Sequence, residues 1–407
     1  MSCEDWKEVK LGDVCEKIQY GYTQSAVKEK IGPKFLRITD IREQYFDWRS
    51  VPYCDISKSD FLKYRLYPGD IVIARTGATT GISKYIDQTV PNAVFASYLI
   101  RIRVKDGINS RFIGYVVSSK KYKRYIKSIL SGSAQPNANA KQLTSFLFQL
   151  PPKEEQNKIS EILSSLDDKI ELNHQINQDL EEMAQAIFKS WFVDFEPFRD
   201  GEFVDSELGP IPKGWRVDKL GNVSTVTGGG TPKTKVPDYW ENGNILWATP
   251  SDMTSKNSMV LFDTSRKITE LGLQNSSAKL LPKGSVLMTS RATIGYTSIA
   301  MKEVSTNQGF INIVCNKQIS NYYMLCYLLH FKDRILRLAN GSTFMEVSKR
   351  NFKEINVVVP PHNLIEKFNQ YIEPIIETIY QHEQQNQILS NLRDTLLPKL
   401  MSGEIRV

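Results

Sequence analysis

The pattern of apolar and polar residues changes abruptly at two pairs of prolines. The stretches LFQLPPKEEQNKISEIL (147–163) and NVVVPPHNLIEKFNQYI (356–372) each pass from a short apolar run into a long mixed segment, 209 positions apart. After each pair, apolar residues recur at alternating steps of four and three, which is the spacing of a coiled-coil seam. The pattern predicts two long helices, each beginning at a double proline.

Both predicted seams turn polar near their middles, at Asn173, Asn177, His382 and Asn386. Polar seam residues cost stability but fix the register of a helix pair. In an antiparallel pair, Asn173 would meet Asn386. Asn177 would likewise meet His382; the alternative is that all four side chains are solvated. Pro374 lies inside the second helix, where we expect a kink or a break at a cost of roughly 3 kcal/mol.

The segments before the two helices repeat at the same shift. Trp6 aligns with Trp215, and the 145 residues from Trp6 to Leu150 match the 145 from Trp215 to Val359. Short β-branched runs bounded by Gly, Pro and Asn predict strands at 70–74, 98–104, 285–290 and 310–315. Apolar residues at helical spacing predict helices at 110–130 and 321–339.

The expected fold class is α+β, with two similar α+β domains joined by two long antiparallel coiled-coil helices in pseudo-two-fold symmetry. Antiparallel pairing follows because the first helix leaves the first domain and the second helix starts from the second domain. The expected boundaries are 1–150 for the first domain, 151–195 for the first helix, 196–212 for a linker, 213–359 for the second domain, 360–400 for the second helix and 401–407 for a tail.

Charge is divided unevenly along the chain, which the net charge of +7 conceals. Residues 1–150 carry 24 Lys and Arg against 14 Asp and Glu, and residues 213–359 carry 19 against 10. Residues 151–212 carry 5 against 15. Two basic domains on acidic helices indicate two surfaces for a polyanion, with binding that falls as salt rises. The alternative is that the basic side chains are only solvated.

Three loops in each copy carry polar tips that suit contacts with DNA. The aligned pairs are RTGATTGISK (75–84) with SRATIG (290–295), GYTQS (21–25) with GGTPK (229–233), and SGSAQPNANAK (131–141) with NGSTFMEVSK (340–349). Arg bonds bidentately to guanine, Asn and Gln bond to adenine, and Thr reaches base edges. The candidate DNA-binding residues are Gln24, Arg37, Arg75, Thr76, Thr79, Lys84, Gln135, Asn137, Lys233, Ser290, Arg291, Thr293 and Lys349. The alternatives are a plain glycine-rich hairpin and, for the asparagines, capping of the following turn. Matching loops with different tips would suit two modules that read different sequences.

Apolar residues also lie beside the predicted seam, at Ile162, Ile176, Met183, Ile365 and Ile376. Additional apolar surface next to a seam indicates a partner helix that completes a bundle. The alternative is contact with the chain's own domains.

Patterns typical of enzymes and membrane proteins are missing from the sequence. The five cysteines have no CxxC spacing, only four histidines are present, and no GxxxxGK[ST] phosphate loop or Asn/Asp-Pro-Pro-aromatic methyltransferase motif occurs. No apolar run approaches the length of a membrane span, and the N-terminus MSCEDWKEVK has no signal-peptide core. We expect a non-catalytic, cytoplasmic protein with free thiols and without a metal.

Two variable domains, each opening with Trp-x4-Leu-Gly and closing in Pro-Pro and a long helix, resemble the specificity subunit of Type I restriction–modification systems. The strongest markers are FLRITDI (35–41), PGDIVIARTG (68–77), LPPKEEQNKISEIL (150–163) and ELNHQINQDLEEMAQAIFKSWFVDFEP (171–197). By this resemblance the domains are target recognition domains, each reading one half of a bipartite asymmetric site in double-stranded DNA.

The resemblance also implies partners in the defence against foreign DNA. The helices would set the spacer and dock two modification (methyltransferase) subunits, which bind S-adenosylmethionine, and restriction subunits that use ATP and Mg²⁺ would join through them. No cofactor is expected in this chain. Two other classes of protein stay open. The first is a coiled-coil scaffold that binds proteins without sequence-specific DNA binding, and gel shifts with the partner present would distinguish it from a DNA-binding subunit. The second is a self-sufficient nuclease or methylase, whose activity assays of the purified chain would reveal.

Overall fold

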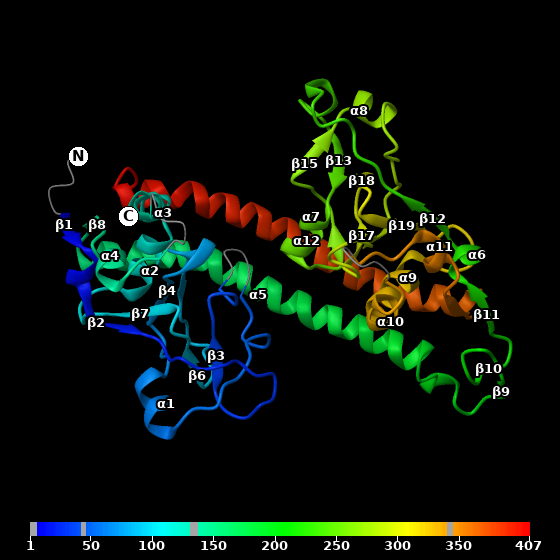
Figure 1. The fold of residues 1–407 in the computed structure, drawn as a ribbon, viewed down its shortest axis with the longest axis horizontal. Helices are drawn as coiled ribbons and strands as arrows, with labels where there is room; N and C mark the ends of the chain where they lie inside the picture. The colour runs from blue at the N-terminus through cyan, green and yellow to red at the C-terminus, as the bar shows by residue number, and fades with distance from the viewer. Residues whose placement is uncertain (1–5, 42–45, 131–136, 340–344) are drawn as a thin grey trace. The chain divides into compact units, whose positions relative to one another are not determined.

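The computed structural model describes residues 6–41, 46–130, 137–339 and 345–407. The chain divides into two compact units, which are residues 1–172 with 386–407, and residues 173–385. Both units mix helices and strands, and each contains part of both long helices (Figure 1). The predicted class, two similar α+β domains with two long antiparallel helices, is confirmed.

Among its described residues, the first unit contains one four-stranded sheet and two smaller strand pairs. A four-stranded antiparallel sheet has the order β2 (Cys15–Tyr20), β7 (Leu99–Val104), β4 (Ile71–Ala74) and β5 (Ser83–Tyr85). The smaller pairings are parallel for β3 (Lys34–Leu36) with β6 (Ala93–Phe95), and antiparallel for β1 (Lys7–Lys10) with β8 (Leu147–Leu150). All four residues of β4 are buried, which explains why its sequence IVIA is apolar without alternation.

The helices of the first unit are α1 (Lys58–Tyr64), α2 (Ser110–Ser118), α3 (Lys120–Leu130) and α4 (Ala140–Thr144), with short 3₁₀ turns η1 (Leu11–Val14) and η2 (Gly77–Thr79). The single helix predicted at 110–130 is two helices. Ser119 has an extended backbone, with ψ of 152°. Its hydroxyl accepts the N–H of Tyr122 at 3.2 Å and so caps α3.

The second unit repeats this plan with additional strands. Its larger sheet has the order β12 (Thr225–Gly228), β19 (Phe310–Val314), β16 (Val286–Thr289), β17 (Thr297–Ala300) and β14 (Val260–Leu261). The smaller sheets are β15 (Arg266–Ile268), β13 (Ile245–Ala248) and β18 (Val304–Thr306); β11 (Arg216–Lys219) with β20 (Asn356–Val359); and β10 (Ile211–Pro212) with β9 (Phe203–Val204). Its shorter helices are α6 (Leu220–Val223), α7 (Pro250–Lys256), α8 (Glu270–Gln274), α9 (Asn321–His330), α10 (Lys332–Leu336) and α11 (Lys349–Lys353), with η3 (Glu196–Phe198) and η4 (Pro237–Tyr239).

The repeat found in the sequence is also a repeat of strand pairing. In β1–β8, Lys7 faces Leu150, and in β11–β20, Arg216 faces Val359. Both partners are shifted by the same 209 positions, so the two domains begin and end in the same hydrogen-bonded register. Each strand before a double proline therefore returns to the start of its own domain.

The long helices are α5 (Lys153–Phe192), of 40 residues, and α12 (His362–Ser402), of 41 residues. They run antiparallel within each unit. In the first unit, Asp167 accepts from Arg393 at 2.9 Å. In the second unit, Asn177 Oδ1 and His382 Nδ1 are 2.8 Å apart, which is the contact predicted for an antiparallel pair.

The polar middle of the helix pair is a hydrogen-bonded layer. Asn177 contacts His382 and also donates to Glu383 Oε1 at 3.3 Å, while Asn173 donates to Gln385 at 2.8 Å. Asn173 and Asn177 are buried, so the alternative of solvated side chains is wrong for these two residues. Asn386, which belongs to the first unit, is also buried.

Pro374 does not divide the second helix, which corrects the expectation of a break. The helix is continuous from His362 to Ser402. Pro374 is exposed, so the carbonyl group that loses its N–H partner belongs to the solvent side of the helix. The carbonyl of Pro374 itself accepts the hydroxyl of Thr378 at 2.8 Å.

Candidate nucleic-acid interface

Arg75 lies at the meeting point of the three predicted loops of the first domain. It follows β4, and its Nη2 donates to Asn137 Oδ1 at 3.2 Å. The guanidinium lies 5.0 Å from the centre of the Tyr20 ring, at the end of β2. The Tyr20 hydroxyl in turn accepts the N–H of Ala140 at 3.0 Å. The fold thus gathers side chains from three loops that are distant in sequence.

Backbone hydrogen bonds hold these loops together. The N–H of Ala138 donates to the carbonyl of Arg75 at 2.9 Å, and Thr76 forms a β-bridge with Asn137. Thr79 donates its hydroxyl to the carbonyl of Thr76 at 3.3 Å. The loop is therefore preorganised, with Arg75, Thr76, Thr79 and Asn137 as one group. Gln135 lies outside the described residues.

Asn139 follows the capping alternative. Its side chain accepts the N–H of Gln142 at 2.8 Å, and the Gln142 side chain accepts the N–H of Asn139 at 2.9 Å. This reciprocal pair is a capping box at the start of α4. It fixes the far side of the loop that carries Asn137.

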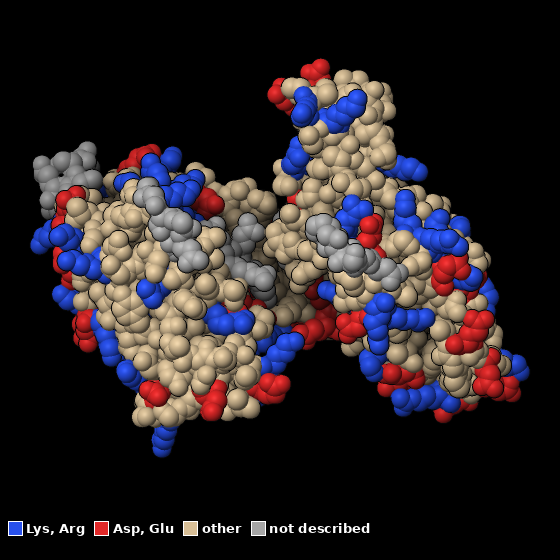
Figure 2. Space-filling model, in the orientation of Figure 1, with Lys and Arg blue, Asp and Glu red and all other residues tan. Residues whose placement is uncertain are grey.

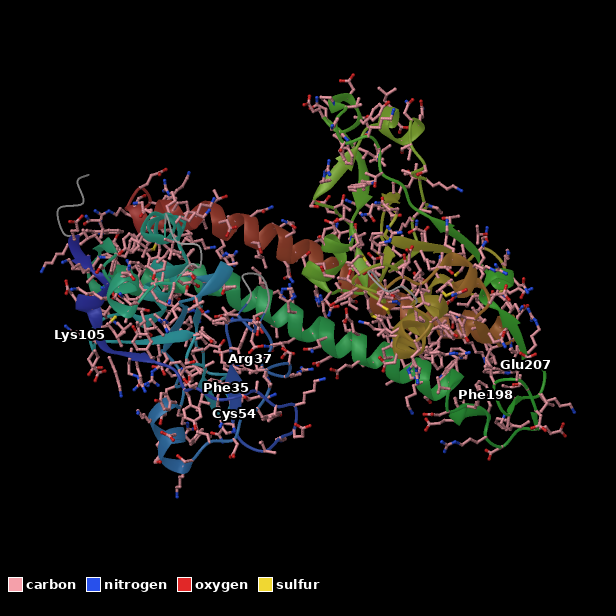
Figure 3. All side chains as sticks on the ribbon, in the orientation of Figure 1. Phe35, Arg37, Cys54, Lys105, Phe198 and Glu207 are labelled. Carbon is pink, nitrogen blue, oxygen red and sulfur yellow. The ribbon has the colours of Figure 1, made fainter. Side chains whose placement is uncertain are left out.

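Three other candidates of the first domain lie outside the Arg75 group. Lys84 is on β5 and lies 4.6 Å above the ring of Phe46, where desolvation lowers its pKa. Arg37, which Figure 3 labels, binds Asp40 through two hydrogen bonds of 2.7 and 3.0 Å, and these bonds raise the pKa of the arginine. Gln24 is exposed, and its side-chain carbonyl accepts the N–H of the following residue.

The second domain builds the same junction from different side chains. Arg291 follows β16 and donates to Glu346 Oε2 from Nη2 at 2.9 Å and from Nε at 3.2 Å. The N–H of Val347 donates to the carbonyl of Ser290 at 3.0 Å. Ala292, next to Arg291, has a φ of 61°, a left-handed conformation that costs an alanine about 1–3 kcal/mol and is concentrated at functional sites.

The partners of the two arginines are equivalent positions of the repeat. Asn137 and Glu346 are 209 residues apart, yet one is a neutral amide and the other is a carboxylate. An amide matches the donor and acceptor of adenine, whereas a carboxylate accepts from the amino group of cytosine. The same scaffold therefore presents different hydrogen-bonding groups in each domain. Sequence reasoning missed Glu346, although the repeat period applied to Asn137 identifies it.

The remaining candidates of the second domain are distributed around this junction. Lys349 is the first residue of α11. It lies against the end of β12, since a Cβ added to Gly228 would be 2.9 Å from the Nζ of Lys349. Ser290 is buried, whereas Thr293 is exposed at the loop tip. Lys233 is exposed, and its carbonyl accepts the indole N–H of Trp240 at 3.2 Å.

The apolar helix residues divide into exposed and buried sets. Ile162 and Met183 are exposed, and Ile176 is half-buried. Ile365 and Ile376 are buried in the core of the second unit, so the expectation that they form a partner surface is wrong and contact with the chain's own domain holds. Exposed apolar residues that the seam pattern did not single out lie elsewhere on the same helices, at Leu172, Tyr371, Ile388 and Leu392.

A cavity of about 430 Å³ opens beside α5 in the second unit. Glu181 lines it and accepts the N–H of Met259 at 3.0 Å. Burial raises the pKa of Glu181 to about 7, and the nearby carboxylate of Glu383 adds to the shift. This group ties the long helix to the body of the domain.

Within the described ranges, no cluster of His, Cys, Asp and Glu has the geometry to hold a metal ion. In the same part of the chain, none of the helices combines the length and the apolar character needed to cross a bilayer.

A family model described as the Type I restriction modification DNA specificity domain matches residues 3–182 and 212–391. The chain is 28% identical to the MjaIX specificity subunit of Methanocaldococcus jannaschii over 99% of this chain and 94% of that protein. It is 26% identical to the HindI specificity subunit of Haemophilus influenzae, over 98% and 100% respectively. The Type I restriction–modification S subunit from M. genitalium has a similar fold, with a TM-score of 0.59 at 16% identity over 97% and 96% of the two chains.

Proposed function

Because this chain belongs to the DNA specificity family of Type I restriction–modification systems and is not itself an enzyme, we propose that each of its domains reads one half of a bipartite, asymmetric DNA target. Specificity subunits of this family bind DNA and act in complexes with modification and restriction subunits. The first half-site would be read by residues 1–150 and the second by residues 213–359. The two half-sites would differ in sequence, since the two loop groups differ in chemistry.

The observation that carries this proposal is the pair of equivalent loop junctions. Arg75 with Asn137 and Arg291 with Glu346 stand at corresponding places in the two copies. Each arginine follows a buried strand and is oriented by its partner, as a base-reading side chain needs to be before it enters a groove. Matched positions with unmatched partners are what two half-sites of different sequence require.

The long helices supply the second part of the proposal. As a coiled coil they would fix the spacer between the half-sites and dock two modification subunits, with restriction subunits joining through these. The docking surface of the first unit would include the exposed Ile162, Leu172, Ile388 and Leu392, and that of the second unit would include the exposed Met183. S-adenosylmethionine would be bound by the modification subunits, and ATP with Mg²⁺ by the restriction subunits.

Sequencing of the methylated sites in DNA from cells that carry the whole system tests this proposal. The expected result is one target in which two half-sites of defined sequence are separated by a spacer of fixed length and undefined sequence. Exchanging residues 213–359 for the corresponding domain of a relative should change one half-site and leave the other. Methylation at a single continuous site, or no sequence preference with the partner subunits present, would favour a protein scaffold instead.

A further inference from the structure

Helix α3 of the first domain is covered with basic side chains. Its sequence KKYKRYIKSIL contains five Lys and Arg residues and no Asp or Glu. Tyr122 and Ile126 are buried on one side, and Lys120, Lys121 and Arg124 are exposed on the other. Residues three and four apart lie on one helix face, so these three cations form a single stripe. Figure 2 shows basic side chains gathered over this helix.

The inner side of α3 is anchored to the loops that carry the candidate base readers. Gly81 closes the Arg75 loop with a φ of +89°, and a Cβ at this glycine would lie 2.8 Å from Ile126. The hydroxyls of Tyr122 and Tyr125 donate to the carbonyls of Leu143 and Gln142 in α4, at 3.0 and 2.7 Å. The stripe is therefore held rigidly beside the Arg75 group.

We propose that α3 is a phosphate clamp: Lys120, Lys121 and Arg124 bind the DNA backbone next to the half-site that the first domain reads. This rests on the proposed function and assigns the helix a separate part in it. Contacts to phosphates position a protein on the duplex, while contacts to base edges specify the sequence. The three cations have no ion-pair partner among the described residues, which leaves their charge available for phosphates.

The second domain has a similar arrangement with less charge. Gly295 closes the Arg291 loop with a φ of +87°, and a Cβ there would lie 3.0 Å from the side chain of Lys332 in α10. Lys332 also lies over the ring of Tyr296, 4.5 Å from its centre. Arg334 and Arg337 follow on α10 and just after it, but Asp333 offsets part of their charge. A basic helix beside the reading loop is thus common to both copies, and the first copy carries the larger charge.

Salt dependence separates a phosphate clamp from a base reader. The full chain with Lys120→Gln, Lys121→Gln and Arg124→Gln is compared with a control carrying Lys7→Gln, Lys10→Gln and Lys105→Gln, which removes the same charge from exposed positions of the same domain. Lys105 lies beside β2, well away from α3 (Figure 3). The chain is mixed with its modification subunits and titrated at several salt concentrations. The probes are a labelled duplex with the methylated target and a duplex of equal length without it.

The helix variant should lower the slope of log affinity against log salt by about 2–3, since each lost phosphate contact contributes roughly 0.9. Affinity should fall by a similar factor on both duplexes, and the control should change the slope by less than about 1. If the helix variant still prefers its target and its slope of log affinity against log salt is unchanged, the clamp is overturned. The clamp is also overturned if the helix variant loses binding of the modification subunits while that slope is unchanged. If the unaltered protein shows no target preference, the proposed function fails; a slope reduced only in the helix variant would still support the clamp.

Discussion

Single side chains carry the difference between the two copies. Arg75 is half-buried between Tyr20 and Asn137, and Arg291 is exposed and bound by Glu346. A guanidinium fixed by a neutral amide keeps its full positive charge, whereas one fixed by a carboxylate presents a neutral pair. We therefore expect the two arginines to read their half-sites by different combinations of donors and acceptors.

Arg75→Ala should relax base preference in one half-site only, by about 1–3 kcal/mol if the contact to guanine is bidentate. Arg291→Ala is the matched variant and should relax the other half-site. Binding to a panel of duplexes with single base changes in each half-site measures both effects. Equal loss on every duplex would identify these arginines as phosphate contacts and not as base readers.

Glu181 should make the second unit less stable as the pH rises. Its pKa is raised from 4.5 to about 7 in the fold, so the folded state holds the proton more tightly than the unfolded chain does. The favourable contribution is complete below pH 4.5 and is lost as pH rises through 7. Glu181→Gln keeps a side-chain oxygen that accepts the N–H of Met259. It should therefore remove the loss of folding stability at high pH, which amounts to no more than about 3 kcal/mol.

Thermal unfolding of both proteins from pH 5 to pH 8 measures the difference. The Gln variant should melt several degrees higher at pH 8, at about 2–4 °C per kcal/mol, and nearly equally at pH 5. Glu182→Gln changes the neighbouring exposed carboxylate and is the control. If Glu182→Gln reduces the pH dependence of the melting temperature as much as Glu181→Gln does, the titration of Glu181 is not the cause of that dependence.

At the scale of elements, the two long helices have an exposed apolar surface. In the first unit, Ile388 and Leu392 are four residues apart on α12 and therefore lie on one face. The Asp167–Arg393 contact sets the antiparallel register, and stepping five residues along each helix from this pair brings Leu172 to the level of Ile388. An apolar area that spans two helices is typical of a surface that a third helix covers.

Replacing Ile388 and Leu392 together by Lys should weaken binding of the modification subunits at least about tenfold, because each buried apolar side chain is worth roughly 1.5–3 kcal/mol. Copurification and titration of the subunits measure the effect. Leu62→Lys alters an equally exposed leucine on α1 and should leave the assembly intact. Unchanged binding in the double variant would place the docking surface elsewhere.

The sequence predicts elements and their order well, since the repeat fixes them twice. Strands such as β4 and β16, and both long helices, follow from local patterns. The continuity of α12 through Pro374 does not follow from a local pattern, because the energetic cost of a proline within a helix depends on whether it lies on the side that faces solvent. The burial of Ile365 and Ile376 could not be predicted for a similar reason. A heptad repeat identifies the residues that face a partner helix, but it does not identify those that face the body of the domain. The contact of Arg75 with Tyr20 and Asn137 depends on tertiary folding and has no local signal.

At the scale of the whole molecule, helix length should determine the spacing of the two half-sites. A helix of 40 residues extends about 60 Å at 1.5 Å per residue, which is longer than one turn of duplex. Inserting four residues between Gln178 and Asp179, and four between Gln381 and His382, lengthens both helices at the same level of the antiparallel pair. Each insertion adds about 6 Å and roughly one helical turn, so the facing of each helix is nearly kept.

The methylated target of this variant should have a longer spacer and unchanged half-sites. Four residues inserted into the exposed turn near Asp205, between β9 and β10, form the control and should leave the spacer as it was. Sequencing of methylated sites reads all three proteins in one assay. If the original spacer persists after the paired helix insertions, the helices do not act as the ruler.

The C-terminal tail returns to the beginning of the first domain. Arg406 binds Glu155 at 3.0 Å and lies 5.3 Å from the centre of the Trp6 ring, while Glu155 accepts the indole N–H of Trp6 at 2.8 Å. Leu400 is buried in the same core, with Ile405 packed against it. The first unit is thus assembled from both ends of the chain, and the second unit from one continuous stretch.

This arrangement has a consequence for synthesis on the ribosome. The first domain emerges first, yet its core lacks the segment 386–407 until that segment has been synthesised, which is roughly ten to fifty seconds later at ordinary elongation rates. During that interval the apolar surface that Leu400 covers is open to water. The second unit can be completed before the first, so a released fragment that ends at residue 385 should contain a protease-resistant second unit and a protease-sensitive first one.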